Sequence, residues 1–306
     1  PGVPGRGTPP PAPPPAPARG APPTGPGGIN IGMNLLNAIY AIASDGMAHV
    51  LNPQTGEDLS PPSRFLAPNA KVAGSVFVDG VLYAATADNC GNVPSGVWAI
   101  ALGTDAKSIA KWTTRGGSVV GRAAPTLGAD GMVYAATTDG DVVALQADSL
   151  AQKDSYSAAT PFTTAPVAFS YRDRQLLVAA NKDGHLYVFD GGALKAPLST
   201  STQVLVTAPD SSLASWEEPD GARWILAAST EPGTTGSVVA FKLIDQNGTP
   251  TLQQAWKSRE INLPASPIVI NGGVTINSFV LYDVEKGEAE RAKELAEAIL
   301  TACLDA

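Results

Sequence analysis

The sequence of 306 residues has only two cysteines and two histidines. Cys90 and Cys303 lie far apart with no CxxC or Cys/His spacing, which excludes a disulfide-rich scaffold and a zinc knuckle and leaves the redox compartment open. Basic residues are also few: 20 Lys and Arg stand against 28 Asp and Glu, a formal net charge of −8. We therefore expect no nucleic-acid partner, because phosphate binding needs clustered cations. Apolar runs are too short to span a membrane, which takes roughly 18–20 residues.

Residues 1–28 are almost entirely Pro, Gly and Ala. Such a composition cannot bury a core, so we predict a disordered or polyproline-II tether, with a ligand for a proline-binding domain as the alternative. The chain begins with Pro1 and shows no signal peptide. We expect that an upstream segment was removed or that this is part of a longer chain.

A meander of short apolar runs begins at Ala123 and ends at Leu150. Asp130-Gly131 and Asp139-Gly140 separate the runs, and Asp-Gly between alternating apolar residues is a strong hairpin signal. Related units recur every 43 to 51 residues, as the apolar residue before each small-residue pair shows: Tyr40, Tyr83, Tyr134, Val178 and Leu226. This period, with several strands per unit, predicts β-propeller blades.

We predict four-stranded antiparallel blades centred on the last four of these positions. Their small pairs should occupy central strands: Ala84-Ala85, Ala135-Ala136, Ala179-Ala180 and Ala227-Ala228. Fourth, outer strands are expected near Ser108–Thr113 and Thr251–Trp256. In two units, the insertions Ala87–Ser95 and Thr230–Thr235 replace the tight Asp-Gly turn that stands at the same point of the repeat in other units. Insertions at one point of a repeat lie on one face, which is often the binding face.

The motif YAATTDGDVVAL, residues 134–145, and the run LNPQTGE, residues 51–57, resemble the quinoprotein (PQQ-like) β-propeller repeat. The resemblance extends over about Asn37–Asn271 and is strongest to bacterial extracytoplasmic members, so it implies a periplasmic or extracellular location. Complete rings in that group have seven or eight blades, whereas five or six are visible here. The expected fold is an incomplete all-β propeller over residues 29–276.

The last segment, residues 277–306, has a different character. Apolar residues recur along Glu288–Leu304 with helical spacing, which predicts a strand followed by an amphipathic helix. The segment weakly resembles a C-terminal part of FAD-linked glycolate or lactate oxidases. This resemblance favours a junction between the propeller and an unrelated piece of sequence. A capping helix of the propeller is the alternative, and FVLYD, residues 279–283, also resembles the third strand of a PQQ-like blade.

Candidate site residues are few. The resemblance implies PQQ with calcium, held by Glu, Asn and Asp oxygens, but the adjacent-cysteine disulfide of that family is absent because Cys90 stands alone. Asp88 and Asn89 lie in the inserted loop where such ligands could converge, although a structural role is the simpler interpretation. His49 and His185 sit inside strands and are interpreted as structural. Trp216, Glu217 and Glu218 form an acidic–aromatic cluster, interpreted as a strand end packing on the next blade.

Two functions follow from these patterns. The first is a non-catalytic propeller scaffold of the cell envelope that binds a protein or small ligand on its loop face, like the propeller lipoprotein of the outer-membrane assembly machinery. The second is a fragment of a quinone-dependent alcohol dehydrogenase. We assign no catalytic or metal-binding residue and no certain cofactor, since no GxSxG, phosphate loop or Ser/His/Asp set is present. Fold alone does not decide between the two. The scaffold is the preferred hypothesis because the site residues of the dehydrogenase family are absent.

Overall fold

The computed structural model consists almost entirely of β-strands. It describes residues 37–102, 108–120, 124–202, 205, 212–230, 235–262, 264–270, 273–276 and 280–283. Within these ranges, six antiparallel sheets form in chain order, and a short 3-10 turn, η2 (Cys90–Asn92), lies in the second. None of the described helical segments has the length and apolarity of a membrane span. The predicted tether at residues 1–28 and helix at 288–304 lie outside the described residues.

Each sheet is a simple up-and-down meander. The first holds β1 (Ile39–Ile42), β2 (Met47–Leu51) and β3 (Ser63–Arg64). The second holds β4 (Val72–Val78), β5 (Val81–Thr86), β6 (Gly96–Ala101) and β7 (Ile109–Thr113). The third holds β8 (Thr126–Leu127), β9 (Met132–Ala136), β10 (Asp141–Gln146) and β11 (Gln152–Ser157).

The remaining sheets follow the same order. The fourth holds β12 (Val167–Tyr171), β13 (Arg174–Ala180), β14 (Leu186–Asp190) and β15 (Ser199–Thr200). The fifth holds β16 (Ala214–Glu217), β17 (Arg223–Thr230), β18 (Thr235–Gln246) and β19 (Thr249–Lys257), with β20 (Ile261–Asn262) paired to β18. The sixth holds β21 (Ile268–Ile270), β22 (Gly273–Ile276) and β23 (Val280–Asp283).

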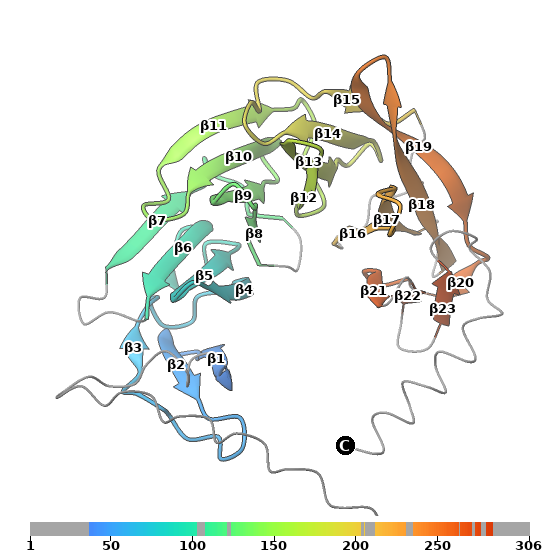
Figure 1. Cartoon of the computed structure of the whole chain (residues 1–306). Helices are drawn as coiled ribbons and strands as arrows, with labels where there is room; N and C mark the ends of the chain where they lie inside the picture. Colours follow the sequence, from blue (N-terminus) through green and yellow to red (C-terminus); the bar gives the residue numbers. More distant parts are fainter. Residues whose placement is uncertain are drawn as a thin grey trace, which may run out of the picture.

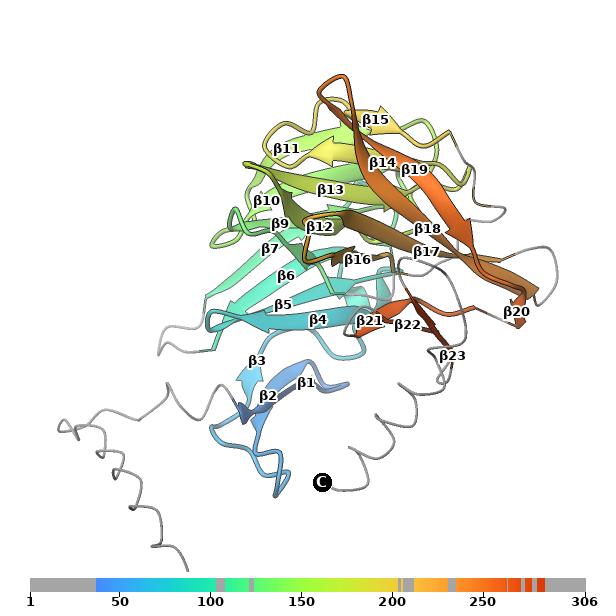
Figure 2. The same cartoon turned by 45° about the vertical axis from the view of Figure 1, so that its right-hand side comes forward.

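The six sheets stand side by side around an arc, like blades (Figure 1). In the second to sixth sheets the first strand faces the centre, and the later strands lie progressively outward (Figures 1 and 2). The four predicted blades are confirmed, with β5, β9, β13 and β17 as their second strands. The predicted outer strands are also confirmed, as β7 and β19.

Apolar residues alternate between the two faces of each sheet, because successive side chains of a strand point in opposite directions. In β5, Leu82 and Ala84 pack toward the first sheet, whereas Tyr83 and Ala85 pack toward the third. The same alternation gives a separate apolar core between every two consecutive sheets. We call the side facing the preceding sheet the back face and the side facing the next sheet the front face.

The predicted alanine pairs are what allow the sheets to approach closely. All eight side chains are buried, with exposures of 0 to 2%. At the rims, close approach depends on glycine: a Cβ on Gly46 would lie 2.1 Å from the carbonyl oxygen of Leu66. Gly46 also has a φ of +83°, which only glycine adopts without strain. The repeat thus encodes both the sheets and their spacing.

The strand predicted in residues 277–306 has a clear place. β23 (Val280–Asp283) pairs in antiparallel register with β22, from Gly273↔Asp283 to Ile276↔Val280. This part of the segment is therefore the third strand of the sixth sheet, the alternative that FVLYD indicated.

Candidate functional site

One face of the arc carries the turn between β1 and β2 of the first sheet and the turns between the second and third strands of the second, third and fourth sheets. Because each sheet is an antiparallel meander, these turns fall at the same end of successive sheets. Each of these four turns contains an aspartate: Asp45, Asp88, Asp139 and Asp183. We call this surface, made of residues 43–46, 87–95, 137–140 and 181–184, the loop face. It includes the inserted loop at 87–95, while most of the second insertion lies outside the described residues.

The inserted loop, residues 87–95, is built from left-handed backbone. Asp88, Asn89, Gly91 and Asn92 all have φ between +50° and +65°, a region in which Asn, Asp and Gly are favoured. The side-chain oxygen of Asn89 accepts a hydrogen bond from the Ser95 backbone nitrogen at 2.8 Å, and the Asn89 nitrogen donates to Ser95 Oγ at 3.2 Å. Asn89 therefore closes the loop on itself.

Asp88 connects the second and third sheets. Its carboxylate is paired with Lys71 and accepts a hydrogen bond from Ser118 Oγ at 3.2 Å, while its backbone nitrogen donates to the same hydroxyl at 3.0 Å. Hydrogen bonds from Lys71 and Ser118 and the positive charge of Lys71 lower the pKa of Asp88. Its oxygens are thus already engaged by groups of this chain.

A second ion pair lies just beneath the next turn. Arg115 holds Asp141 through two hydrogen bonds, Nη2 to Oδ1 at 2.6 Å and Nε to Oδ2 at 3.0 Å, and Ser157 Oγ donates to Oδ1 at 2.5 Å. Asp141 is 6% exposed, so this carboxylate is neutralised within the sheet framework. No role for Asp141 is predicted from the sequence. The sequence feature that could have indicated it is Asp141 itself, a carboxylate at the first position of the otherwise mostly apolar strand β10.

Both histidines serve the framework. His185 Nδ1 donates to the Ser201 carbonyl oxygen at 3.0 Å, and its backbone nitrogen donates to Asn181 Oδ1 at 3.0 Å. His49 Nδ1 lies 3.0 Å from Asp58 Oδ1 on the back face of the first sheet. Neither histidine meets the loop aspartates through a hydrogen bond that the structure records.

The cluster at Trp216, Glu217 and Glu218 lies at the start of the fifth sheet. Trp216 packs in the core toward the sixth sheet. Glu217 pairs with Arg223, and Glu218 accepts a hydrogen bond from the Trp224 indole nitrogen. These contacts fix the first two strands of the sheet together.

Arg223 joins this cluster to the fourth sheet. Its guanidinium lies 4.9 Å from the Phe169 ring centroid, and Nη2 donates to the Ser170 carbonyl oxygen at 3.3 Å. Burial lowers the pKa of Arg223, an effect that Glu217 opposes. The arrangement stabilises the boundary between the two sheets and leaves both acidic side chains of the cluster partnered.

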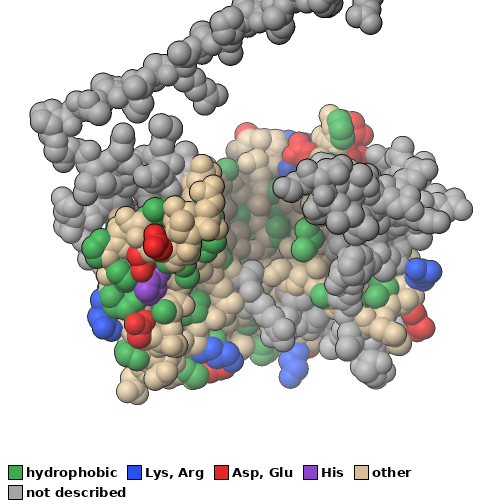
Figure 3. Space-filling view, turned by 90° about the horizontal axis from the view of Figure 1, so that it is seen from below, with side chains coloured by type: hydrophobic (Ala, Val, Ile, Leu, Met, Phe, Trp, Pro, Cys, Tyr) green, Lys and Arg blue, Asp and Glu red, His purple; other side chains and the backbone are tan. Residues whose placement is uncertain are grey.

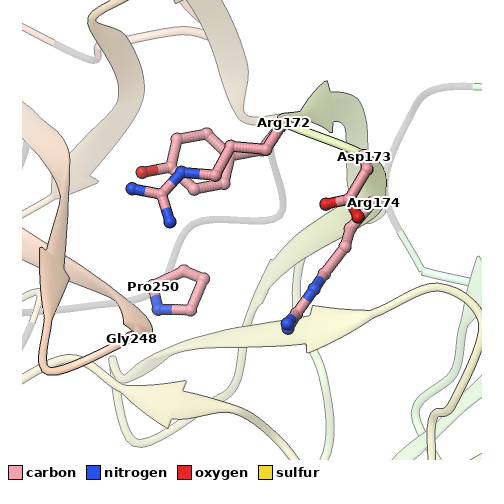
Figure 4. Close-up of a pocket in the computed structure, with 6 residues that line it drawn as sticks. Arg172, Asp173, Arg174, Gly248 and Pro250 are labelled. Carbon is pink, nitrogen blue, oxygen red and sulfur yellow. The ribbon is translucent and has the colours of Figure 1, made fainter.

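A small pocket opens on the face opposite the loop face, with a volume of about 80 Å³. It is lined by the hairpin turn Tyr171–Arg174 and by Gly248 and Pro250 (Figure 4). Arg172 pairs with Asp245 at 2.8 Å, and Arg174 lies 3.9 Å from Asp190. Both guanidinium groups are thus paired with carboxylates of the same chain.

The described residues do not fit a quinone and calcium site. Calcium prefers six to eight oxygen ligands, with carboxylates free to approach the ion. Asp88 is held by Lys71, and Asp139 accepts a hydrogen bond from the Gly117 nitrogen at 2.9 Å. In the described part of the chain, no three His, Cys, Asp or Glu side chains converge as metal ligands would. Cys90 is a free thiol there, and Cys303 lies outside that part.

No protein-family model matches the sequence, and no curated protein matches it. Solved structures do match in fold. The computationally designed protein Ika8 has a TM-score of 0.57 at 14% identity, over 82% of this chain and 70% of its own. BamB from Moraxella catarrhalis has a TM-score of 0.55 at 16% identity, over 83% of this chain and 72% of its own.

Two dehydrogenases match as well. Quinohemoprotein alcohol dehydrogenase ADHIIG from Pseudomonas putida HK5 has a TM-score of 0.56 at 13% identity, and a europium-containing methanol dehydrogenase has 0.58 at 11%. This chain matches over 82% of its length in both cases, but spans 56% and 66% of theirs. At these identities the likeness shows a shared β-propeller fold and no more. It gives no support to the oxidase resemblance of residues 277–306.

Proposed function

We propose that this chain is a non-catalytic binding scaffold of the cell envelope, whose loop face receives a protein or small ligand. The observation that carries the proposal is the use of the loop-face side chains. Asp88, Asn89 and Asp139 are hydrogen-bonded to groups of their own or the adjacent sheet, so they hold the loops in place. A rigid platform of this kind binds by shape and charge, without activating a bound group.

The likeness in fold to BamB supports a scaffold, and the likeness to two dehydrogenases supports the alternative, a part of a quinone-dependent oxidoreductase. The chemistry of the described residues favours the scaffold. A quinone site would require carboxylate oxygens free for calcium, whereas the loop carboxylates named above are engaged.

The two ends of β13 offer a matched test of the loop face. Asp183 is exposed in the loop-face turn of the fourth sheet, and Asp173 is exposed in the turn at the opposite end of the same strand. The wild-type chain, Asp183→Lys and Asp173→Lys are each crosslinked in envelope extracts and compared by quantitative mass spectrometry. The proposal expects a partner captured by the wild type and by Asp173→Lys but reduced with Asp183→Lys. Equal capture by all three would contradict a loop-face site.

A further inference from the structure

The turn between β12 and β13 departs from the pattern of the repeat. The corresponding turn between β4 and β5 is Asp79-Gly80, whereas the fourth sheet has Arg172-Asp173. Arg172 has a φ of +54°, a left-handed conformation that Asn, Asp and Gly adopt more readily than a long side chain does. Backbone held in such a region often marks a functional position. Here it places Arg172 and Arg174 at one pocket, on the face opposite the loop face.

The other wall of this pocket is the tip of the hairpin formed by β18 and β19. β18 has 12 residues, whereas β6 and β10, the third strands of two other sheets, have six each. The extra length brings the tip to the fourth sheet, where Ser199 Oγ donates to the Pro250 carbonyl oxygen at 2.6 Å. Asn247-Gly248 closes the hairpin, with the positive φ angles of +55° and +84° that such a turn requires. The wall is therefore fixed against the turn that carries the arginines.

Two aspartates hold the arginines in place. Asp245 Oδ1 accepts a hydrogen bond from a backbone nitrogen of its own turn at 2.6 Å, and its Oδ2 lies 2.8 Å from Arg172 Nη1. Asp190 Oδ1 likewise accepts from a backbone nitrogen of its turn at 2.9 Å, and its Oδ2 lies 3.9 Å from Arg174 Nη1, too far for a hydrogen bond. Each guanidinium has five N–H donors, so most of these donors are not used by the described residues. The side chains of Arg172 and Arg174 are 63% and 50% exposed, so a ligand can reach them.

We propose that the pocket binds one oxyanion group of a small ligand, a carboxylate or a phosphate, between Arg172 and Arg174. Figure 4 shows the two side chains on either side of the pocket. Arginine suits both groups because its planar guanidinium donates parallel hydrogen bonds to two oxygens. The volume of about 80 Å³ suits a single group of this kind and lies well below the roughly 300–1,000 Å³ of pockets that enclose a drug-sized ligand.

A pair of arginines at one pocket is not a general feature of this surface. Figure 3 shows the open side of the arc, where the basic side chains lie at separate points. Asp173 also lines the pocket and is exposed, so its negative charge opposes an anion and provides a test of direction. The site is separate from the loop face, and this inference does not depend on the ligand proposed there.

The test is an NMR titration of the isotope-labelled full chain with inorganic phosphate and, separately, with acetate, at constant ionic strength. Saturable amide shifts at Arg172, Arg174 and Gly248 are expected with at least one probe. Saturation by phosphate alone assigns a phosphate group, and saturation by acetate alone assigns a carboxylate. No saturable shift with either probe, or saturable shifts confined to other residues, overturns the inference.

Variants confirmed as folded by circular dichroism test the individual charges. Arg174→Gln should weaken binding about tenfold or more, because it removes a charged hydrogen-bond donor. Lys153→Gln is the matched control: it makes the same change in net charge at an exposed position of β11 in the third sheet, and it should bind like the wild type. Asp173→Asn should bind more tightly than the wild type. Equal affinities of Arg174→Gln and Lys153→Gln, or weaker binding by Asp173→Asn, would contradict a site between the arginines.

Discussion

The hydroxyl of Tyr134 donates a hydrogen bond to Asp130 Oδ2 at 2.5 Å, across the first hairpin of the third sheet. The tyrosine is 0% exposed, and a Cβ on Gly191 of the next sheet would lie 2.5 Å from its hydroxyl oxygen. One side chain therefore fills the core between two sheets and reaches the polar rim. Burial first, and then the hydrogen bond and charge of Asp130, raise the pKa of Tyr134.

Replacement of Tyr134 tests that position. Tyr134→Phe should lower the free energy of unfolding by about 1 kcal/mol through the lost hydrogen bond, and Tyr134→Asp by several kcal/mol, because it buries an unpaired charge. Urea unfolding followed by fluorescence measures both. An unchanged midpoint for Tyr134→Asp would show that the side chain is solvent-exposed.

The raised pKa of Tyr134 also predicts an alkaline limit to stability. Above pH 10 the unfolded chain releases the phenol proton while the folded chain retains it, so the folded state binds more protons and stability falls as pH rises. One such group contributes a slope of up to about 1.4 kcal/mol per pH unit. Unfolding between pH 9 and 11 should show a shallower slope for Tyr134→Phe than for the wild type. Equal slopes would contradict the assignment to Tyr134.

The Asp88 ion pair predicts an effect at the acidic end. Its folded pKa is lower than the ordinary value of 3.8, so its contribution is present above that value and is lost as pH falls through the lower folded pKa. Asp88→Asn should therefore lose less stability than the wild type between pH 5 and 2. Thermal unfolding across this range measures the difference, with Lys71→Met giving the partner half of a double-mutant cycle.

Gly56 and Gly91 have similar positive φ angles, so substituting each by alanine separates the cost of backbone strain from the cost of steric crowding. Gly56 has a φ of +72° with nothing within 4 Å of an added Cβ, so Gly56→Ala should cost about 1–2 kcal/mol from strain alone. Gly91 has a φ of +65°, and its added Cβ would lie 2.3 Å from the Pro68 carbonyl oxygen. Gly91→Ala should be clearly more destabilising in denaturant unfolding. Equal costs would mean that the inserted loop does not pack on the connection between β3 and β4.

The alanine pairs predict intolerance to larger residues. Ala136 is fully buried in the core between the third and fourth sheets, so Ala136→Leu should destabilise by about 1–3 kcal/mol through overpacking. Ala129 is exposed in the turn that precedes β9, and Ala129→Leu should change stability by less than about 0.5 kcal/mol. Similar melting temperatures for the two variants would contradict close sheet packing.

The sequence predicted the local features of the fold because period-two apolar runs and Asp-Gly turns are encoded within a few residues. It did not predict β3 or β15, which are two residues long and carry no apolar pattern. Contacts between residues that are distant in the sequence were not predicted, for a related reason. Arg115 and Asp141 lie 26 residues apart, and the repeat says nothing about which loop cation meets which carboxylate.

The candidate site was predictable only in part. The inserted loop and its face followed from the position of Ala87–Ser95 in the repeat. The partners of Asp88 could not be predicted from this position. Lys71 directly precedes β4, and Ser118 lies in the connection between β7 and β8. Only the fold brings these groups together. In the structure Asp88, a candidate metal ligand in the sequence, instead holds Lys71 and Ser118.

The choice between a scaffold and a dehydrogenase is tested most directly by titrating the chain with PQQ and calcium while recording absorbance, followed by dye reduction with primary alcohols. Because the loop carboxylates are engaged by Lys71, Ser118 and Gly117, we expect no saturable quinone spectrum and no alcohol-dependent reduction. A stoichiometric bound quinone with alcohol-dependent turnover would contradict the scaffold and establish an oxidoreductase.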